Sequence, residues 1–228
     1  MDELLVCHLG QVEYRAAADL QERLRELRQR RAIGDVLLLL EHPPVYTRGR
    51  RTQEGELPMG AAWYATQGID LVDTPRGGRV TYHGPGQLVG YAIMEAADVV
   101  EHVRAMERAI VGALSEHGIE SRARVDDGPD FTGVWVGERK LASIGVHLSK
   151  GITAHGFAVN VDNDLQPFEW IVPCGLHAQM TSITRELRTA PNMPCFRKRM
   201  AYAFTQEHGR RQRLVALPRL LAREPSIA

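Results

Sequence analysis

Three segments of this sequence combine glycines, histidines and reactive side chains that could support chemistry. The first, residues 76–87, reads RGGRVTYHGPGQ and carries Arg76 and His83 around paired glycines. Paired glycines let a backbone approach a ligand closely and present amide hydrogens as donors. The segment lacks the Gly-Lys-Ser/Thr of a phosphate loop and the spacing of a dinucleotide fingerprint. We expect a ligand-binding turn here rather than a glycine-rich hairpin with a core histidine.

The second segment, residues 137–147, reads GERKLASIGVH and places Lys140 just after a tight turn, at the start of an apolar strand. Of the 28 basic residues only Lys140, Lys150 and Lys198 are lysines, and lysine exchanges its proton more readily than arginine. A lysine that faces inward at such a position is a candidate for proton transfer, because burial disfavours the charged form. Taken alone, this pattern favours an exposed hairpin lysine over a catalytic one.

The third segment, residues 155–176, ends with Cys174 between Pro173 and Gly175. A buried cysteine is usually an inert small hydrophobe, but one fixed by proline and glycine is a better nucleophile candidate. We expect Cys7 in a strand and Cys195 in a helix, where packing explains them. Reactivity requires the thiolate, so Cys174 would need a nearby cation.

Length allows one large domain or at most two small ones, and the lack of a linker-like stretch favours a single domain over residues 1–228. Apolar residues make up 44% and charged residues 25% of the 228 positions, as in a folded globular chain. Acidic and basic residues number 28 each, so no net field favours nucleic acid or an anionic membrane. The longest aliphatic run, residues 36–40, is too short to cross a bilayer.

Cysteine and histidine usage argues against structural cross-links. Three cysteines without paired spacing predict neither a disulfide framework nor a zinc site, and we expect reduced thiols in the cytoplasm. His147, His155 and His177 have no helical or carboxylate partner spacing, so no metal is expected.

Hydrophobic periodicity predicts a mixed α/β (α+β) fold with one main core. Helices are expected at residues 14–31, from a capping box at Asp98 and Glu101 to a stop at Gly118, and at residues 194–208. Strands are expected at residues 36–40, 69–72, 79–82, 87–94, 133–136, 140–148 and 153–161. Residues from about 217 onwards are expected to be loosely held.

Residues 76–91 closely resemble the signature of the octanoyl-[acyl carrier protein]:protein octanoyltransferases of lipoate biosynthesis. The resemblance covers residues 36–187 in order, through EHPPVYT at 41–47, GVWV at 133–136, the lysine block at 140–145, HGFAVN at 155–160, DLQPF at 164–168 and IVPCG at 171–175. One departure is Ala92, where the family has proline after the tyrosine.

The resemblance implies a fold similar to the biotin/lipoate protein ligases, a mixed sheet flanked by helices. It also implies a catalytic pair of Cys174 and Lys140 and requires no cofactor. The substrate-binding residues that it implies are Arg76, Gly77, Gly78, Arg79, Val80, Thr81, Tyr82, His83, Ser143, Ile144, Gly145, Gly156, Phe157 and Ala158.

The activity that the resemblance implies is transfer of an octanoyl group through a Cys174 thioester, with Lys140 as acid and base. The donor would be octanoyl-acyl carrier protein. The acceptors would be lipoyl domains of 2-oxoacid dehydrogenase complexes and the H protein of glycine cleavage. Val80, Ile144 and Phe157 are candidates for lining an acyl tunnel. The arginine clusters at 48–51 and 210–213 are expected to be solvated faces or docking sites for the acidic carrier.

Two other functions stay open at this point. An ATP-dependent lipoate-protein ligase would share the glycine-rich turn and the lysine but would need no cysteine nucleophile. A non-catalytic module that binds lipoyl domains or carrier protein would leave Lys140 and Cys174 with no reason to meet.

Overall fold

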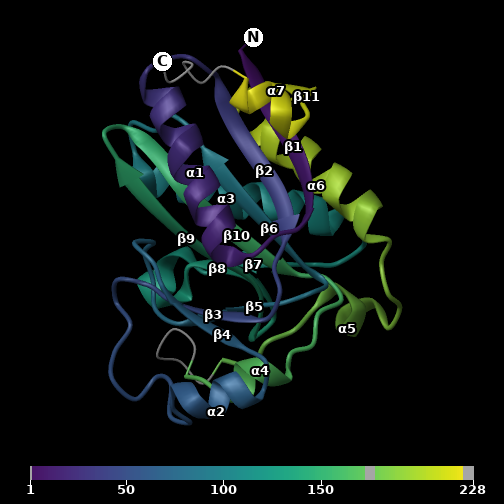
Figure 1. Ribbon diagram of the computed structural model, residues 1–228. Coiled ribbons are helices and arrows are strands. Elements are labelled where there is room, and N and C mark those ends of the chain that lie inside the picture. Colours follow the sequence, from purple (N-terminus) through teal and green to yellow (C-terminus); the bar gives the residue numbers. More distant parts are fainter. Residues whose placement is uncertain (1, 173–177, 223–228) are drawn as a thin grey trace.

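The computed structural model describes residues 2–172 and 178–222, and its centre is an eight-stranded mixed sheet (Figure 1). The strand order is β11-β1-β2-β6-β10-β9-β8-β7. β1 pairs in parallel with β11 and β2, and the other neighbours are antiparallel. The strands are β1 (Glu3–Gln11), β2 (Asp35–Glu41), β6 (Gln87–Ile93), β7 (Arg122–Ala123), β8 (Gly133–Val136), β9 (Arg139–Ser149), β10 (Ile152–Asn160) and β11 (Arg211–Leu214).

The aliphatic run in β2 is buried on both faces of this sheet. Val36, Leu38 and Leu40 join a core cluster with α1 (Tyr14–Gln29), whereas Leu37 and Leu39 join one with α3 (Val99–Ser115) and α6 (Met193–Glu207). Because successive side chains of a strand point to opposite faces, one run of aliphatic residues supplies both cores. Figure 1 accordingly shows α1 crossing one face of the sheet, with α3 on the other.

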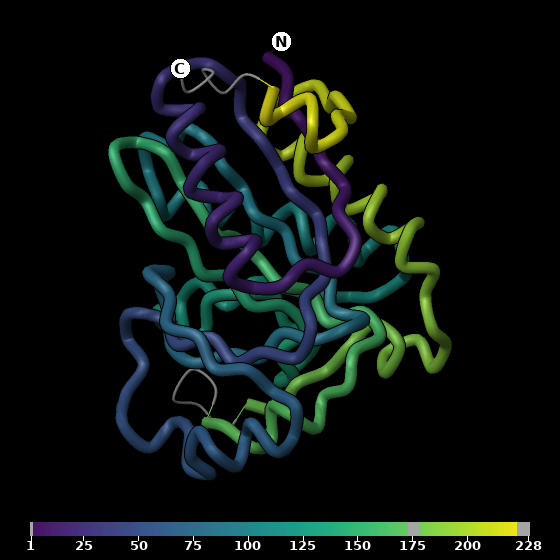
Figure 2. Tube along the Cα trace, viewed as in Figure 1, coloured from purple at the N-terminus to yellow at the C-terminus, as the bar shows by residue number. Residues whose placement is uncertain are grey.

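A smaller sheet lies beside one end of the main sheet (Figure 2). Its order is β4-β3-β5, formed by β3 (Val45–Arg48), β4 (Asp70–Asp73) and β5 (Thr81–His83). The short helices α2 (Ala61–Thr66) and α4 (Gln166–Glu169) contribute to its core of aromatic rings. The glycine-rich turn connects β4 to β5, so the small sheet positions this turn.

Most expected elements are confirmed to within a few residues. The Asp98 side chain accepts hydrogen bonds from the amides of Val100 (2.7 Å) and Glu101 (3.3 Å) and so starts α3 as the capping box predicts. Gly137, with φ of +57°, forms the turn between β8 and β9. The mixed α/β architecture is confirmed by the sheet order.

The terminal segments differ from expectation. Residues 217–221, expected to be loosely held, form α7 (Leu217–Leu221), and Leu220 is buried against the α1 core. β11 was not predicted because its partner β1 is distant in sequence. Other short elements are α5 (Ile183–Leu187) and two 3-10 turns, η1 (Val125–Asp127) and η2 (Pro129–Phe131).

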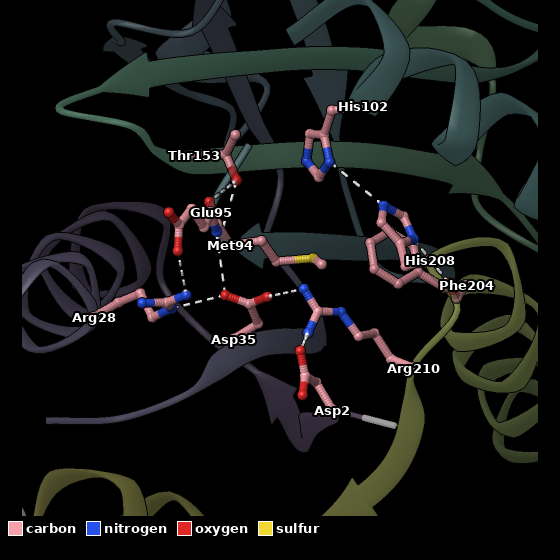
Figure 3. A network of polar contacts seen from close by, with 10 residues as sticks. All are labelled: Asp2, Arg28, Asp35, Met94, Glu95, His102, Thr153, Phe204, His208 and Arg210. Carbon is pink, nitrogen blue, oxygen red and sulfur yellow. Dashed lines mark hydrogen bonds and ion pairs between the residues drawn. The ribbon is translucent and has the colours of Figure 1, made fainter. Parts of the chain in front are cut away.

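A buried carboxylate ties the C-terminal part of the chain to the core (Figure 3). Asp35, 2% exposed, pairs with Arg28 of α1 at 2.7 Å and with Arg210, just before β11, at 3.2 Å. Arg28 also reaches Glu95 at 2.9 Å, and Arg210 reaches Asp2 at 2.8 Å. Opposite charges on three elements therefore hold α1, β2 and β11 together.

Among the residues that the structure describes, none of the helices has the length and apolar content needed to cross a membrane.

Candidate active site

A cavity of about 540 Å³ lies among the glycine-rich turn, β9, β10 and the start of α3. It gathers residues that are far apart in the sequence. Of the residues expected at the site, those that line it are residues 76–81, His83, Lys140, residues 143–145 and residues 156–158. The fold therefore brings together nearly all the expected binding residues whose placement is described.

Tyr82 is the exception, because it does not line the cavity. It lies between Thr81 and His83 on β5, so its side chain points to the opposite face. Its ring packs 5.5 Å from those of Tyr46 and Phe168 in the core of the small sheet. Burial there raises the pKa of Tyr82 to about 12. We therefore correct the expectation that Tyr82 lines the substrate site: its ring packs in the core of the small sheet that positions the glycine-rich turn.

The glycine-rich turn is held in place by Arg76. Its buried guanidinium donates to the carbonyl and hydroxyl oxygens of Thr47, both at 2.7 Å, and to the carbonyl of Gly77 at 2.9 Å. The Gly77 amide donates to the carbonyl of Val146 at 2.9 Å, which attaches the turn to the edge of β9. Gly145 allows this approach, since a Cβ there would lie 2.8 Å from the Gly77 oxygen. The turn is thus fixed to both sheets.

Lys140 lies at the start of β9 and is only 3% exposed. Its ammonium nitrogen lies 5.3 Å from the centre of the Trp135 ring, within the range of a cation–π contact. Gly133 makes room for it, since a Cβ there would lie 2.9 Å from Lys140 Cε. The expectation of an exposed hairpin lysine is wrong: this lysine is buried and lines the cavity.

Cys174 lies outside the described residues, but the segments on either side of it are placed. The Val172 amide donates to the carbonyl of Glu56 at 3.0 Å. On the far side, the Lys140 amide donates to the carbonyl of Gln179 at 2.8 Å. The chain that leaves the cysteine segment therefore reaches the catalytic lysine candidate.

The other two cysteines occupy different surroundings. Cys7 is buried in β1, and burial raises its pKa. Cys195 lies in the first turn of α6 and is exposed, so the expectation that packing explains it is wrong. Neither residue lines the cavity.

Sequence reasoning missed a cluster of tyrosines and histidines at the cavity. Tyr14, Tyr91 and His155 line it together with His83. His42 lies behind Tyr91: its Nδ1 donates to the carbonyl of Val12, so its Nε2 accepts from the Tyr91 hydroxyl, both at 2.6 Å. Tyr91 and His155 occur in the family motifs, and that was the available signal.

Burial keeps the histidines of this cluster neutral. It lowers the pKa of His42 to about 4 and that of His155 to about 3, and it lowers the pKa of His83 well below its usual range. The nearby Arg76 guanidinium lowers the pKa of His83 and His155 further. This wall of the cavity is thus polar but uncharged, apart from Arg76.

Four valines that sequence reasoning did not assign to the site also line the cavity. Val99, Val100 and Val103 at the start of α3 line it with Val125 of η1. Val100 is exposed, and Val99 and Val103 are half-buried.

Comparison with known proteins decides the family. Residues 13–205 match the lipoyl protein ligase A/B catalytic domain. The chain is 50% identical over 179 residues to an octanoyltransferase of Solibacter usitatus, an alignment that covers 77% of this chain and 80% of that protein. The chain belongs to the octanoyltransferase family. An octanoyltransferase of Dictyoglomus thermophilum is 40% identical over 211 residues, which cover 92% of this chain and 89% of the relative.

The fold of this octanoyltransferase is shared with ligases. A bi-partite lipoate protein ligase from Thermoplasma acidophilum superposes with a TM-score of 0.73 at 17% identity, covering 95% of this chain and 88% of that one. A biotin protein ligase from Aquifex aeolicus gives a TM-score of 0.52 at 13% identity, covering 91% and 70%. The expected biotin/lipoate ligase-like fold is therefore confirmed, and the octanoyltransferase is an acyltransferase of lipoate biosynthesis.

Proposed function

We propose that this octanoyltransferase moves the octanoyl group from acyl carrier protein to a lysine of lipoyl domains through a thioester on Cys174. Lys140 would serve as its acid and base. The observation that carries the proposal is Lys140, the single lysine lining the cavity within the described residues, joined by its backbone to the segment that follows Cys174.

Chain connectivity limits how far Cys174 can be from Lys140. Gln179, whose carbonyl accepts from the Lys140 amide, is five residues after Cys174. Five extended residues span at most about 18 Å. A thiol on this short tether, beside a cavity lined by a buried ammonium group, supports the pairing.

In the first half-reaction the Cys174 thiolate attacks the carbonyl carbon of the octanoyl thioester on the carrier's phosphopantetheine arm. A carbon–sulfur bond to Cys174 forms, the bond to the carrier sulfur breaks, and the departing thiolate takes a proton from the Lys140 ammonium. Before attack, that ammonium favours the thiolate form of Cys174. Exchange of one thioester for another conserves bond type, so no ATP is needed.

In the second half-reaction the neutral amine of the acceptor lysine attacks the same carbonyl. The amide bond forms, the Cys174 thiolate leaves, and Lys140 in its neutral form takes the proton of the incoming amine. Backbone amides of residues 143–145 and of the glycine-rich turn are proposed to stabilise the oxyanion. Because an amide is more stable than a thioester, the second step draws the sequence forward.

The middle of the cavity suits an alkyl chain. Val80, Ile144 and Phe157 line it together with Ala158. Each methylene that leaves water contributes about 0.8 kcal/mol, so eight carbons give substantial binding energy. A thiolate nucleophile also requires a reducing compartment, and we propose the cytoplasm as the location.

The acceptors are proposed from chemistry that the family shares. We propose lipoyl domains of 2-oxoacid dehydrogenase complexes and the glycine cleavage H protein, each acylated on a lysine. Val100 and Val125, which are exposed and line the cavity, are proposed as part of the surface that a protein partner contacts during transfer.

Intact-mass spectrometry with octanoyl-carrier protein tests the covalent route. We expect the wild-type enzyme to gain one octanoyl group that hydroxylamine removes, and Cys174→Ala to gain none. Cys195→Ala is the matched control, because Cys195 is exposed yet away from the cavity, and it should be acylated like the wild type. Near wild-type transfer by Cys174→Ala would refute the thioester route. Pyrophosphate release that depends on octanoate and ATP would instead indicate a ligase.

A further inference from the structure

His155 carries two local energetic costs that ordinary packing does not explain. It lies within β10 yet has φ of +61°, in the left-handed region that an L-residue with a bulky side chain rarely adopts. Its side chain is 5% exposed, and its Nδ1 has no hydrogen-bond partner among the residues that the structure describes. Strain of this kind gathers at functional sites, and His155 lines the cavity.

The strand register places His155 at the opposite end of the cavity from Lys140. His155 pairs with Val146 on β9, six residues beyond Lys140. At a rise of about 3.3 Å per residue, this separates the two positions by roughly 20 Å along the strand. The reactive end and the histidine end of the cavity are therefore distinct.

The cavity between these ends has a floor of small residues. Gly145 pairs with Gly156, and Ser143 pairs with Ala158. Next to these small residues the lining becomes polar: Gly156 of β10 also pairs with Tyr91 of the neighbouring strand β6. An extended chain of eight carbons, with bonds of about 1.5 Å, spans roughly 9 Å. The Lys140 side chain and the thioester occupy much of the remaining distance between Lys140 and His155.

At the histidine end, the Tyr91 hydroxyl and the Nδ1 of His83 have hydrogen-bond partners, whereas the Nδ1 of His155 and the Nε2 of the adjacent Gln21 have none among the described residues. The Tyr91 hydroxyl donates to His42, which is itself fixed to the carbonyl of Val12. His83 Nδ1 donates to Gln87 at 2.7 Å. The ring of His155 lies edge-on to that of Tyr91, with centres 6.0 Å apart, and keeps its unpaired nitrogen.

We propose that His155, backed by Tyr91, forms the stop that sets the length of the acyl chain. The inference rests on the proposed function in taking Lys140 as the reactive end. A chain of eight carbons ends before the polar wall, whereas a longer chain would press its last methylenes against ring nitrogen and phenol oxygen. Those methylenes would gain no apolar contact and would displace any water bound to the unpaired nitrogen.

A competition experiment tests the proposal. The enzyme receives an equimolar mixture of octanoyl- and decanoyl-carrier protein, and the ratio of the two acyl groups on the acceptor domain gives the ratio of kcat/KM. His155→Gly relieves the backbone strain and opens the wall. We expect it to lower the preference for octanoyl over decanoyl about tenfold, the usual scale for methylene discrimination in a pocket.

Lys150→Gly is the matched control. Lys150 also has a positive φ, +49°, but it lies exposed in the β9–β10 hairpin and does not line the cavity. Replacement of this residue by glycine should leave the octanoyl-to-decanoyl ratio as in the wild type. A ratio that shifts equally in both variants would assign the effect to backbone strain and overturn the proposal.

An unchanged ratio in a folded His155→Gly enzyme would also overturn it. If that variant does not fold, His155→Asn replaces it, since asparagine tolerates the left-handed region and is shorter. It should shift the ratio in the same direction, and a wild-type ratio there would again reject the stop. The octanoyl-to-decanoyl ratio is measured on the acylated acceptor domain, whatever route the acyl group takes. Absence of a Cys174 adduct would therefore refute the thioester route but would not change the test of His155.

Discussion

The amide of Lys140 donates a 2.8 Å hydrogen bond to the carbonyl of Gln179, and the Lys140 carbonyl accepts one of 2.9 Å from the amide of Thr181. These two bonds seat residues 179–181 alongside the start of β9. A loop and a hairpin strand, separated in the sequence by the whole of β10, are thereby joined at the residue we propose as acid and base. The backbone therefore brings the segment that follows Cys174 to Lys140.

Replacing Lys140 should raise the pKa of the Cys174 thiol. Lys140→Met keeps the length and the apolar stem of the side chain but removes the charge that favours the thiolate. The rate of alkylation by iodoacetamide, followed against pH by mass at Cys174, should rise at higher pH than in the wild type. Lys198→Met, on the exposed surface of α6, should leave the profile unchanged. Identical profiles for Lys140→Met and the wild type would exclude the coupling.

Gly90→Ala should destabilise the core beside the cavity. A methyl group on Gly90 would overlap the ring of Phe157 on the neighbouring strand. Overpacking of this kind costs about 1–3 kcal/mol of unfolding free energy, measured by urea denaturation. Phe157→Leu in the same chain should return part of that loss. If the double variant is as unstable as the sum of the two single variants, the clash is not the cause.

Asp35→Asn should be strongly destabilising. Asp35 is buried between Arg28 and Arg210, so neutralising it leaves two guanidinium groups with less compensation (Figure 3). Breaking a buried pair in this way costs about 3 kcal/mol of unfolding free energy. Asp73→Asn, which removes an exposed pair with Arg48, should change stability by less than about 1 kcal/mol. Equal losses in chemical denaturation would contradict this account.

Stability should fall as the pH drops below about 6.5. Burial lowers the pKa of His102 and His42 to about 4, against 6.5 for a histidine in the unfolded chain. Between these values the unfolded state binds protons that the folded state does not, so each such histidine removes about 1.4 kcal/mol per pH unit. Their contribution is complete above pH 6.5 and is lost progressively down to about pH 4.

His102→Gln isolates one of these groups. Glutamine can still donate to His208, whose Nε2 lies 3.4 Å from His102 Nδ1, but it does not titrate. The slope of unfolding free energy against pH between 6.5 and 4.5 should become shallower in this variant. A slope equal to that of the wild type would show that His102 is protonated in the folded protein.

The local elements were predictable because their signals are local. The aliphatic run at residues 36–40, the capping box at Asp98 and the turn at Gly137 each depend on neighbours within a few positions. The direction of the Tyr82 side chain was not predictable, since it is set by the pairing of β5 with β3, a strand distant in sequence. The same reason explains why α7 and the parallel pairing of β11 with β1 were missed.

The amino-acid sequence by itself determined the family, the order of the motifs and the residue types available for chemistry. Only the tertiary structure decided that Lys140 is buried, that Tyr82 turns away from the cavity, and that His155 is buried in its wall. Burial and facing depend on which strands pair and in what register. Which strands pair depends on many contacts between segments that are far apart in the sequence, so no single stretch of the chain determines the pairing.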